Sequence, residues 1–178
     1  MDFSCELSEG ILLRPVRKSD AVPLAAAFQA NRSHLAPWEP VRPESFYSVE
    51  GQREVIGRRL AELHAGTAVP LVLAGDAGIV GLLNLSSIVR GAFQNAHLGY
   101  WISDSFQGRG LMTAAVAAAT QLAKVNLGLH RLEAATLVHN TASQRVLEKN
   151  RFEAYGTARA YLRIAGEWQD HRMHQLIL

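Results

Sequence analysis

Apolar and polar residues follow two periods along this chain, and the changes between them predict the order of strands and helices. Short runs rich in branched and aromatic residues indicate strands, and apolar positions three and four residues apart indicate helices. Strands are expected at 11–16, 69–74, 78–86, 97–103, 131–138, 159–165 and 168–178. Helices are expected at 21–30, 50–65, 111–127 and 141–149. The mixture of strands and helices predicts an α/β (α+β) protein.

Local signals near the N-terminus sharpen these boundaries. Pro15 interrupts the first strand, which is therefore expected at an edge of the sheet. Ser19 and Asp20 precede the first helix and are able to cap it. Three prolines predict that 31–43 is a loop. Trp38 in this loop either anchors local packing or forms a wall of a binding cleft.

Turn residues define the other connections. The strands 69–74 and 78–86 are expected to form a hairpin around 75–78. Gly128 is expected to end the long helix because glycine adopts the left-handed conformation readily. A turn at Gly166-Glu167 is expected to join the last two strands in a second hairpin.

The stretch 97–113 joins a buried strand to an alanine-rich helix through a turn with two glycines. Gly108 and Gly110 flank Arg109, so the backbone can turn tightly and leave bare N–H groups where the helix begins. Such N–H groups and the helix dipole bind phosphate oxygens, and Arg109 adds positive charge. An ordinary turn is the alternative. The glycine spacing matches neither a P-loop nor a dinucleotide fold.

Composition narrows the class of protein. The 178 residues favour one domain that covers 1–178. Lys and Arg number 18 against 16 Asp and Glu, and a formal charge of +2 is too small for a bulk nucleic-acid binder. The single cysteine, Cys5, excludes an internal disulfide and fits a reducing compartment. No apolar run reaches the roughly 20 residues of a membrane span, and no signal-peptide pattern begins the chain. A cytoplasmic protein without a direct nucleic-acid or membrane partner is expected.

Several strings resemble one enzyme family. The stretch 107–112 is similar to the acetyl-CoA pyrophosphate loop of the GNAT N-acetyltransferase superfamily, Gln/Arg-x-x-Gly-x-Gly/Ala, with Gln107 and Gly110 matching and Met112 at the place of the last small residue. The strings 99–102 and 107–115 resemble "GYWI" and "QGKGLMTEA" of the Rim-type (RimJ/RimL-like) ribosomal-protein N-acetyltransferases, except that Ala114 replaces the usual Glu. The string 166–171 resembles "G-x-W-x-D-H" of the same branch.

A further string follows the strand 131–138. Asn140, Ser143, 146–149 and Phe152 resemble "N-x-x-S-x-x-V-L-E-K-L-G-F" of the family. Arg151 stands where that string has Gly, so the left-handed residue after the helix is expected one position earlier, at Asn150. From the residues alone, Asn140 is favoured as a helix N-cap over a ligand-binding residue.

The resemblance implies a GNAT fold, which is a mixed, mostly antiparallel sheet flanked by helices, with acetyl-CoA (coenzyme A) as acetyl donor. It also implies that backbone N–H groups near 101–103, splayed at a bulge, polarise the thioester carbonyl. The residues that it assigns to the cofactor are Trp101, Ile102, Ser103, Gln107, Gly108, Arg109, Gly110, Leu111, Met112, Thr113, Asn140 and Ser143.

Acetyl transfer also requires a group near the leaving sulfur and a route for the amine proton. The resemblance implies that Ser143 assists the sulfur, and a capping hydroxyl is the alternative. His97 is the favoured base because imidazole titrates near neutral pH. A solvent-exposed His97 without a role, His139 or His171 in its place, and a chain of water molecules are the alternatives. Asp170 is expected to orient a neighbouring group rather than to take part in acetyl transfer itself.

The acceptor and any further partners are less constrained. His171 and His174 would face opposite sides of a strand, so no metal site is expected.

An α-amine of a ribosomal or other protein is the favoured acceptor, because its pKa near 7.7–8.0 demands less of a base than a lysine near 10.4. A small-molecule amine (polyamine, aminoglycoside or amino-acid derivative) and a non-catalytic acyl-CoA-binding module are the alternatives. A homodimer also stays open.

Overall fold

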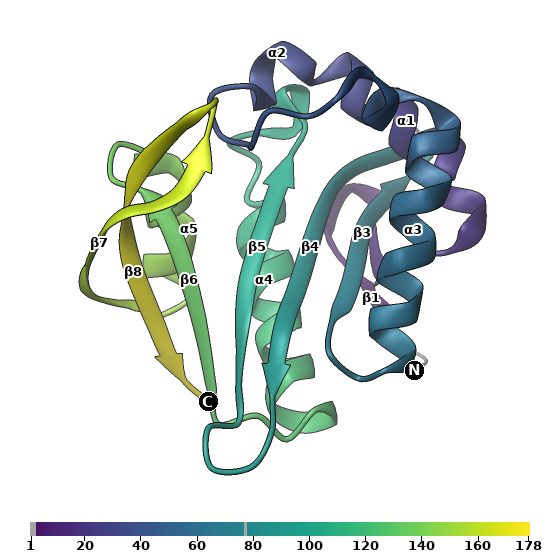
Figure 1. The fold of residues 1–178 in the computed structure, drawn as a ribbon. Helices are drawn as coiled ribbons and strands as arrows, with labels where there is room; N and C mark the ends of the chain where they lie inside the picture. Colours follow the sequence, from purple (N-terminus) through teal and green to yellow (C-terminus); the bar gives the residue numbers. More distant parts are fainter. Residues whose placement is uncertain (1–2, 77) are drawn as a thin grey trace.

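Eight strands form one sheet in the order β1-β2-β3-β4-β5-β6-β8-β7 in the computed structural model, which describes residues 3–76 and 78–178 (Figure 1). The strands are β1 (Cys5–Glu6), β2 (Leu12–Pro15), β3 (Val69–Gly75), β4 (Gly78–Val89), β5 (Asn95–Ile102), β6 (Arg131–Leu137), β7 (Glu153–Ile164) and β8 (Glu167–Ile177). All neighbouring strands are antiparallel except β5 and β6, which are parallel. The expected mixed, mostly antiparallel sheet is confirmed.

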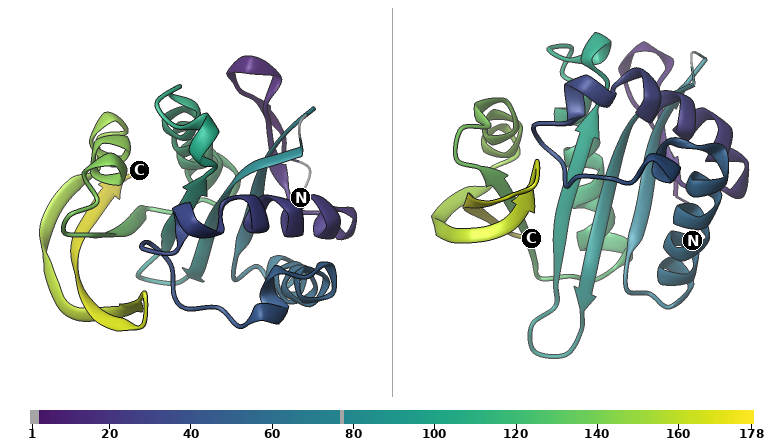
Figure 2. Two further views of the ribbon diagram at one scale, coloured as in Figure 1. Left: turned by 90° about the horizontal axis from the view of Figure 1, so that it is seen from above. Right: turned by 45° about the horizontal axis from the view of Figure 1, so that its top comes forward.

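Helices cover both faces of the sheet. They are α1 (Ala21–Ala30), α2 (Arg32–Leu35), α3 (Val49–His64), α4 (Leu111–Gln121) and α5 (Thr141–Lys149), with 3-10 turns at Ser8–Gly10, Lys18–Asp20, Glu44–Tyr47 and Asp104–Phe106. Figures 1 and 2 show α4 and α5 on one face and α1 and α3 on the other. No helix of the described residues has the length and apolar content to span a membrane.

α4 forms because its eleven residues include five alanines and no Gly or Pro. Its buried residues are Leu111, Met112, Ala115, Val116 and Ala119. They pack in the same core cluster as Leu83, Leu98 and Leu132 of the sheet. The predicted helical stretch continues past α4 as a π-helical turn at Leu122–Asn126, and Gly128 takes a positive φ of 60° after it.

The gap between β5 and β6 is the feature of the fold that positions the site. Only 95–97 of β5 pair with 131–133 of β6, and beyond these residues the two strands diverge (Figure 1). β6 remains paired with β8 along its whole length, and β5 remains paired with β4. The sheet therefore opens into a V at the end where α4 and α5 begin.

The first long strand is not the sheet edge that Pro15 predicted. β1 pairs with Leu12 and Leu13 of β2, and β3 pairs with β2 on the other side as far as Pro15. β2 accommodates Pro15 because the proline lies past the two residues that β1 contacts.

The cap expected at Asp20 was also wrong. The Asp20 carboxylate accepts hydrogen bonds from the Arg17 N–H at 2.7 Å and from two guanidinium nitrogens of Arg14 at 2.8 Å each. It thus fixes the turn before α1 and makes no side-chain cap to α1 itself. The segment 31–43, predicted as a loop, contains α2, because its prolines at 37, 40 and 43 all follow Leu35.

Two features nearer the site lie at other residues than expected. The left-handed residue after α5 is Arg151, with φ 63°, and not Asn150. The Asn150 side chain donates to the carbonyls of Val146 (2.9 Å) and Thr113 (3.2 Å), which keeps Asn150 at the helix end and moves the turn to Arg151. The pairing of β4 with β5 is regular at 101–102, where a bulge was expected; β4 shifts register between Ser86 and Val89 against β5, and opposite Leu73 and Ala74 against β3.

The two hairpins stand close to their expected positions. β7 and β8 turn at Ala165 and Gly166, one residue before the predicted turn, and both residues have positive φ (51° and 89°), as in a type I′ turn. β3 and β4 form the other predicted hairpin. Ala77, in the turn of that hairpin, lies outside the described residues.

Candidate functional site

A cavity of about 640 Å³ opens between the diverging strands and the first turns of α4 and α5. Its size is typical of a ligand pocket. Its walls come from α2, the end of β5, the turn 106–110 and both helix N-termini. The residues that line it are His34, Leu35, Trp38, Tyr100, Trp101, Ile102, Phe106, Gln107, Gly108, Gly110, Leu111, Met112, Thr113, His139, Asn140, Thr141, Ala142, Ser143, Arg145, Val146 and Lys149.

The N-terminus of α4 faces this cavity without a cap of its own. Gly110 is the N-cap residue and has φ 79°, a left-handed conformation that favours glycine. No side chain of the described residues caps the helix. The first N–H groups of a helix need partners, so this end can accept an anion.

The N-terminus of α5 is capped by its own sequence. The Asn140 side-chain oxygen accepts a hydrogen bond from the Ser143 N–H at 3.0 Å, which confirms the N-cap favoured from the sequence. Asn140 and Ser143 also line the cavity. Ser143 is thus held in the first turn of α5 with its side chain at the cavity wall.

Tyr100 reaches Ser143 across the gap between β5 and α5. Its hydroxyl oxygen lies 2.8 Å from Ser143 Oγ, and its O–H donates to the Ser143 carbonyl at 3.1 Å. Burial raises the pKa of Tyr100 to about 12, although the hydrogen bond with Ser143 acts in the opposite direction. The phenol therefore stays protonated across the neutral pH range.

The free edge of β5 offers backbone donors to the larger cavity. The Ser103 N–H bonds the Val80 carbonyl in β4 at 2.8 Å. Because successive residues of a strand direct their N–H groups to opposite edges, the N–H groups of Ile102 and Tyr100 face the gap left by β6. Of the three residues 101–103, Ile102 is therefore the one placed to polarise a carbonyl by its N–H.

Positive charge in the larger cavity comes from α5 and not from the glycine turn. Arg145 and Lys149, one turn apart, both line it. The Arg109 guanidinium does not line the larger cavity, because it donates to the Glu9 carboxylate at 3.0 Å and to the Ser105 carbonyl at 2.8 Å. The i,i+4 spacing of Arg145 and Lys149 on a helix that begins at the cavity was the signal in the sequence that could have identified them.

A smaller cavity of about 180 Å³ lies on the other side of the gap, toward the curled β7–β8 hairpin. Leu35, Trp38, Tyr100, Trp101, Asn140 and Ser143 line both cavities. The remaining wall is largely apolar, with Leu162 and Ile164 of β7 among its residues. The two cavities therefore meet at Tyr100 and Ser143.

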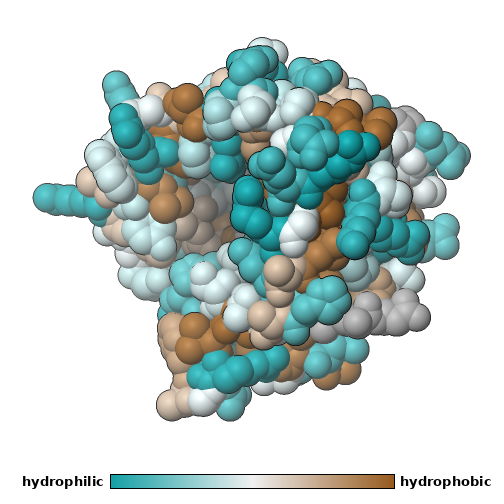
Figure 3. Space-filling model, turned by 45° about the vertical axis from the view of Figure 1, so that its right-hand side comes forward, coloured by the Kyte–Doolittle hydropathy of each residue, from teal (hydrophilic) through white to brown (hydrophobic). Residues whose placement is uncertain are grey.

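The segment 36–43 borders the smaller cavity through Trp38 and Glu39. It runs from α2 to the tip of the β7–β8 hairpin, where the Ala165 N–H donates to the Glu39 carbonyl at 3.0 Å (Figure 1). Trp38 of this segment stacks on His139 with ring centroids 5.5 Å apart. Figure 3 shows the surface hollowed between the β7–β8 side of the molecule and the helices α1 and α3. Trp38 thus both packs locally and lines the two cavities.

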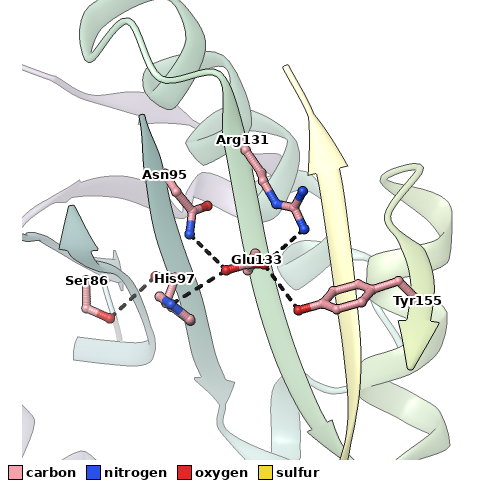
Figure 4. Close-up of polar contacts among 6 residues, drawn as sticks. All are labelled: Ser86, Asn95, His97, Arg131, Glu133 and Tyr155. Carbon is pink, nitrogen blue, oxygen red and sulfur yellow. Dashed lines mark hydrogen bonds and ion pairs between the residues drawn. The ribbon is translucent and has the colours of Figure 1, made fainter. Parts of the chain in front are cut away.

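His97 lies outside both cavities. It sits in the paired half of β5, with Nε2 3.7 Å from a carboxylate oxygen of Glu133 and its side chain 38% exposed (Figure 4). Tyr100 is three residues further along β5, about 10 Å away, and on the opposite face of the sheet. His97 can therefore reach an amine at Ser143 only through intervening water.

Glu133 is the centre of the polar cluster beside His97 (Figure 4). Its carboxylate accepts hydrogen bonds from Asn95 (2.9 Å), Arg131 (3.0 Å) and Tyr155 (3.1 Å). Burial raises the pKa of Glu133, but these three hydrogen bonds together bring it below its ordinary value. Glu133 is therefore held in the ionised form and is a weak proton acceptor.

Other titratable groups stand nearer the gap than His97. His139 lines the larger cavity, and His171 and Glu39 line the smaller one. Glu39 is the single acidic residue among the described residues that line either cavity, and burial raises its pKa against the influence of Arg42 and Arg59. Asp170 accepts a hydrogen bond from the Ala160 N–H at 2.8 Å, which orders the irregular part of β7.

The structure brings together most of the residues that the sequence pointed to. All of those assigned to the cofactor line the larger cavity except Arg109 and Ser103, whose hydroxyl instead accepts from Asn31 at 3.1 Å. The sequence did not single out Tyr100 as a partner of Ser143, nor His34, which contacts Gln107 at 2.9 Å. Neither pair is close in sequence, so no local pattern reveals it.

Comparisons with known proteins give a consistent picture. The profile of the acetyltransferase (GNAT) domain family matches residues 11–153. The ribosomal protein uS5-alanine N-acetyltransferase of Escherichia coli (strain K12) is 37% identical over 167 residues, which cover 92% of this chain and 86% of that protein.

Solved structures agree with this match. The ribosomal-protein-S5-alanine acetyltransferase from Vibrio fischeri has a TM-score of 0.94 at 34% identity, over 99% of this chain and 97% of that chain. Mycobacterium smegmatis RimJ in complex with CoA-disulfide has a TM-score of 0.90 at 32% identity, over 94% and 81% of the two chains. The likeness thus extends over nearly the whole sheet and both helix layers.

Proposed function

This chain belongs to the GNAT acetyltransferase family, and on that premise we propose that it acetylates the N-terminal α-amine of a ribosomal protein. The observation that carries the proposal is the meeting of two cavities at Tyr100 and Ser143, one with anion-binding features and one largely apolar. The named activity of the uS5-alanine N-acetyltransferase relative supports the choice of acceptor. A ribosomal acceptor would place the reaction in the cytoplasm.

The larger cavity fits acetyl-CoA by the chemistry of its walls. The uncapped N-terminus of α4 offers N–H groups for the pyrophosphate, and Arg145 and Lys149 offer charge for phosphate oxygens. The free edge of β5 at Tyr100 and Ile102 suits an extended arm with amide groups. When bound, acetyl-CoA supplies an acetyl group activated as a thioester.

The smaller cavity suits the end of a polypeptide. Its volume of about 180 Å³, with Trp38 and Glu39 on one wall, leaves room for a short, thin segment. The amine would approach Ser143 from the β7–β8 side, opposite to acetyl-CoA. Its nitrogen attacks the carbonyl carbon, the new C–N bond forms, and the C–S bond breaks with the electron pair on sulfur. The amine proton leaves through water toward His97, His171 or Glu39.

Turnover of acetyl-CoA with free thiol as readout tests the proposal. A peptide that ends in a free N-terminal alanine is compared with the same peptide blocked at its N-terminus but carrying an internal lysine. We expect acetylation at the α-amine of the first peptide, located by mass spectrometry, and none of the second. Acetylation confined to lysine side chains or polyamines would contradict the proposed acceptor.

Replacement of His97 adds information on the base. An α-amine is mostly neutral above its pKa of about 7.7–8.0. We therefore expect His97→Ala to keep much of its activity at high pH and to lose more at neutral pH. Equal loss at every pH would exclude a role for His97 in removing the amine proton.

A further inference from the structure

Tyr100 is the residue whose hydroxyl is in contact with that of Ser143, and the reaction as described gives it no role. It projects from β5 at the point where both cavities meet and is half-buried. At 2.8 Å, the separation of the two hydroxyl oxygens is that of a normal O–H···O hydrogen bond. No other side chain of the described residues hydrogen-bonds Ser143 Oγ.

The two hydroxyls carry two hydrogens and have two arrangements. In the first, Ser143 donates to Tyr100, and Tyr100 donates to the Ser143 carbonyl at 3.1 Å. In the second, Tyr100 donates to Ser143 Oγ, and the Ser143 hydrogen is free to point into the larger cavity. A thioester sulfur is a weak acceptor, so the first arrangement suits the resting site. A thiolate is a strong acceptor and favours the second.

We propose that Tyr100 is the positioning residue for Ser143, which it holds at the cavity wall and turns into a hydrogen-bond donor as charge develops on the leaving sulfur. Asn140 fixes the Ser143 backbone separately, so the whole movement is the rotation of two hydroxyl groups about their C–O bonds. The interaction is made with the departing thiolate more than with the bound thioester, and such interactions raise kcat. This inference rests on the proposed acetyl transfer.

Tyr100 donates a hydrogen bond and not a proton. Burial raises its pKa to about 12, so the phenol holds its proton more tightly than a thiol with an ordinary pKa of about 8.5. The sulfur keeps the electron pair of the broken C–S bond and leaves as a thiolate bonded to Ser143. It takes its proton from solvent, and Tyr100 and Ser143 end with the hydrogens they began with.

Kinetics of Tyr100→Phe, Ser143→Ala and the double variant test this inference against acetyl-CoA and a peptide acceptor. We expect Tyr100→Phe to lower kcat about tenfold, the value of one neutral hydrogen bond, with the KM for acetyl-CoA within about twofold. In the Ser143→Ala background the same change should have no further effect on kcat, because Tyr100 acts through Ser143. Tyr47→Phe, which removes a hydroxyl that lines neither cavity, is the matched control and should keep full turnover.

The pH profile separates positioning from proton transfer. The kcat profile of Tyr100→Phe between about pH 6 and pH 10 should be lower than that of the wild type but identical in shape, since no group with a pKa in this range is removed. A changed shape, losses that multiply in the double variant, or an unchanged kcat would each overturn the inference. Absence of turnover by the wild-type protein would instead reject the proposed function. Melting temperatures of all variants establish that each is folded.

Discussion

α4 and α5 begin at the same cavity, and they differ in how their first N–H groups are satisfied. α5 carries its own cap, because the Asn140 side chain accepts from the Ser143 N–H. The N-cap residue of α4 is Gly110, which has no side chain to offer. A helix end that its own sequence has satisfied contributes to stability, whereas an end left open contributes to binding. Under the proposed function, the ligand anion would bind at α4, whereas α5 presents the fixed hydroxyl of Ser143.

Gly110→Val should have the largest effect on this comparison. A β-branched residue at φ 79° is strained, and its side chain would stand where phosphate approaches the open N–H groups. We expect acetyl-CoA affinity, measured by calorimetry, to fall at least tenfold, or about 1.4 kcal/mol.

Gly128→Val is the matched control for this change. Gly128 also has a positive φ (60°) and, like Gly110, has no atom within 4 Å of an added Cβ, but it lies at the far end of the same helical stretch. It should lose stability to a similar extent and keep its affinity. Unchanged binding by a folded Gly110→Val protein would remove the pyrophosphate from the N-terminus of α4.

Removal of positive charge from α5 should have a smaller effect. Arg145→Gln with Lys149→Gln leaves the cap of α5 in place and takes two cations from the cavity. We expect acetyl-CoA affinity to fall about three- to tenfold at low salt, and the difference from wild type to shrink at high salt because ions screen exposed charges. Arg53→Gln, on α3 and paired with Glu50, is the charge control. An effect independent of salt would argue against a direct role with phosphate.

Asn140→Ala should have the smallest effect on binding and a clear effect on stability. Loss of an N-cap costs about 1 kcal/mol of unfolding free energy. Ser48→Ala removes the equivalent cap of α3, where Ser48 accepts from the Gly51 N–H at 3.0 Å, and should cost about the same. Neither variant should change acetyl-CoA affinity by more than about twofold. A tenfold loss in Asn140→Ala alone would mean that both helix ends serve the ligand.

The contrast between the two helices also separates what the sequence could predict from what it could not. Gly110 and Asn140 act within a few residues of their own position, so local rules identified the open turn and the cap. The Tyr100–Ser143 and His34–Gln107 contacts join residues 43 and 73 positions apart and depend on how strands and helices meet. Arg109 was assigned to the cavity from its place in the loop, but its side chain instead forms an ion pair with Glu9, 100 residues away in the sequence.

Helix boundaries and strand pairing show the same division between local and long-range features. The boundaries of α1 and α5 were predicted to the residue because propensity and capping are local. The place of β2 inside the sheet was missed because two residues of β1, too short to show a pattern, cover it. His97 was placed correctly on β5, but the face that it occupies and the 3.7 Å contact with Glu133 depend on the register of β6.

The short pairing of β5 with β6 divides the sheet into two leaves, β1–β5 and β6-β8-β7, joined by three residue pairs. Such a junction can act as a hinge, with the Glu39–Ala165 hydrogen bond as the clasp at the open end. Small rotations of one leaf about the junction would widen or narrow the place where the two cavities meet, at Tyr100 and Ser143. Amide hydrogen exchange should record this as slower exchange throughout the second leaf when acetyl-CoA is bound, whereas slower exchange in the first leaf should be confined to the free edge of β5 and the N-terminus of α4.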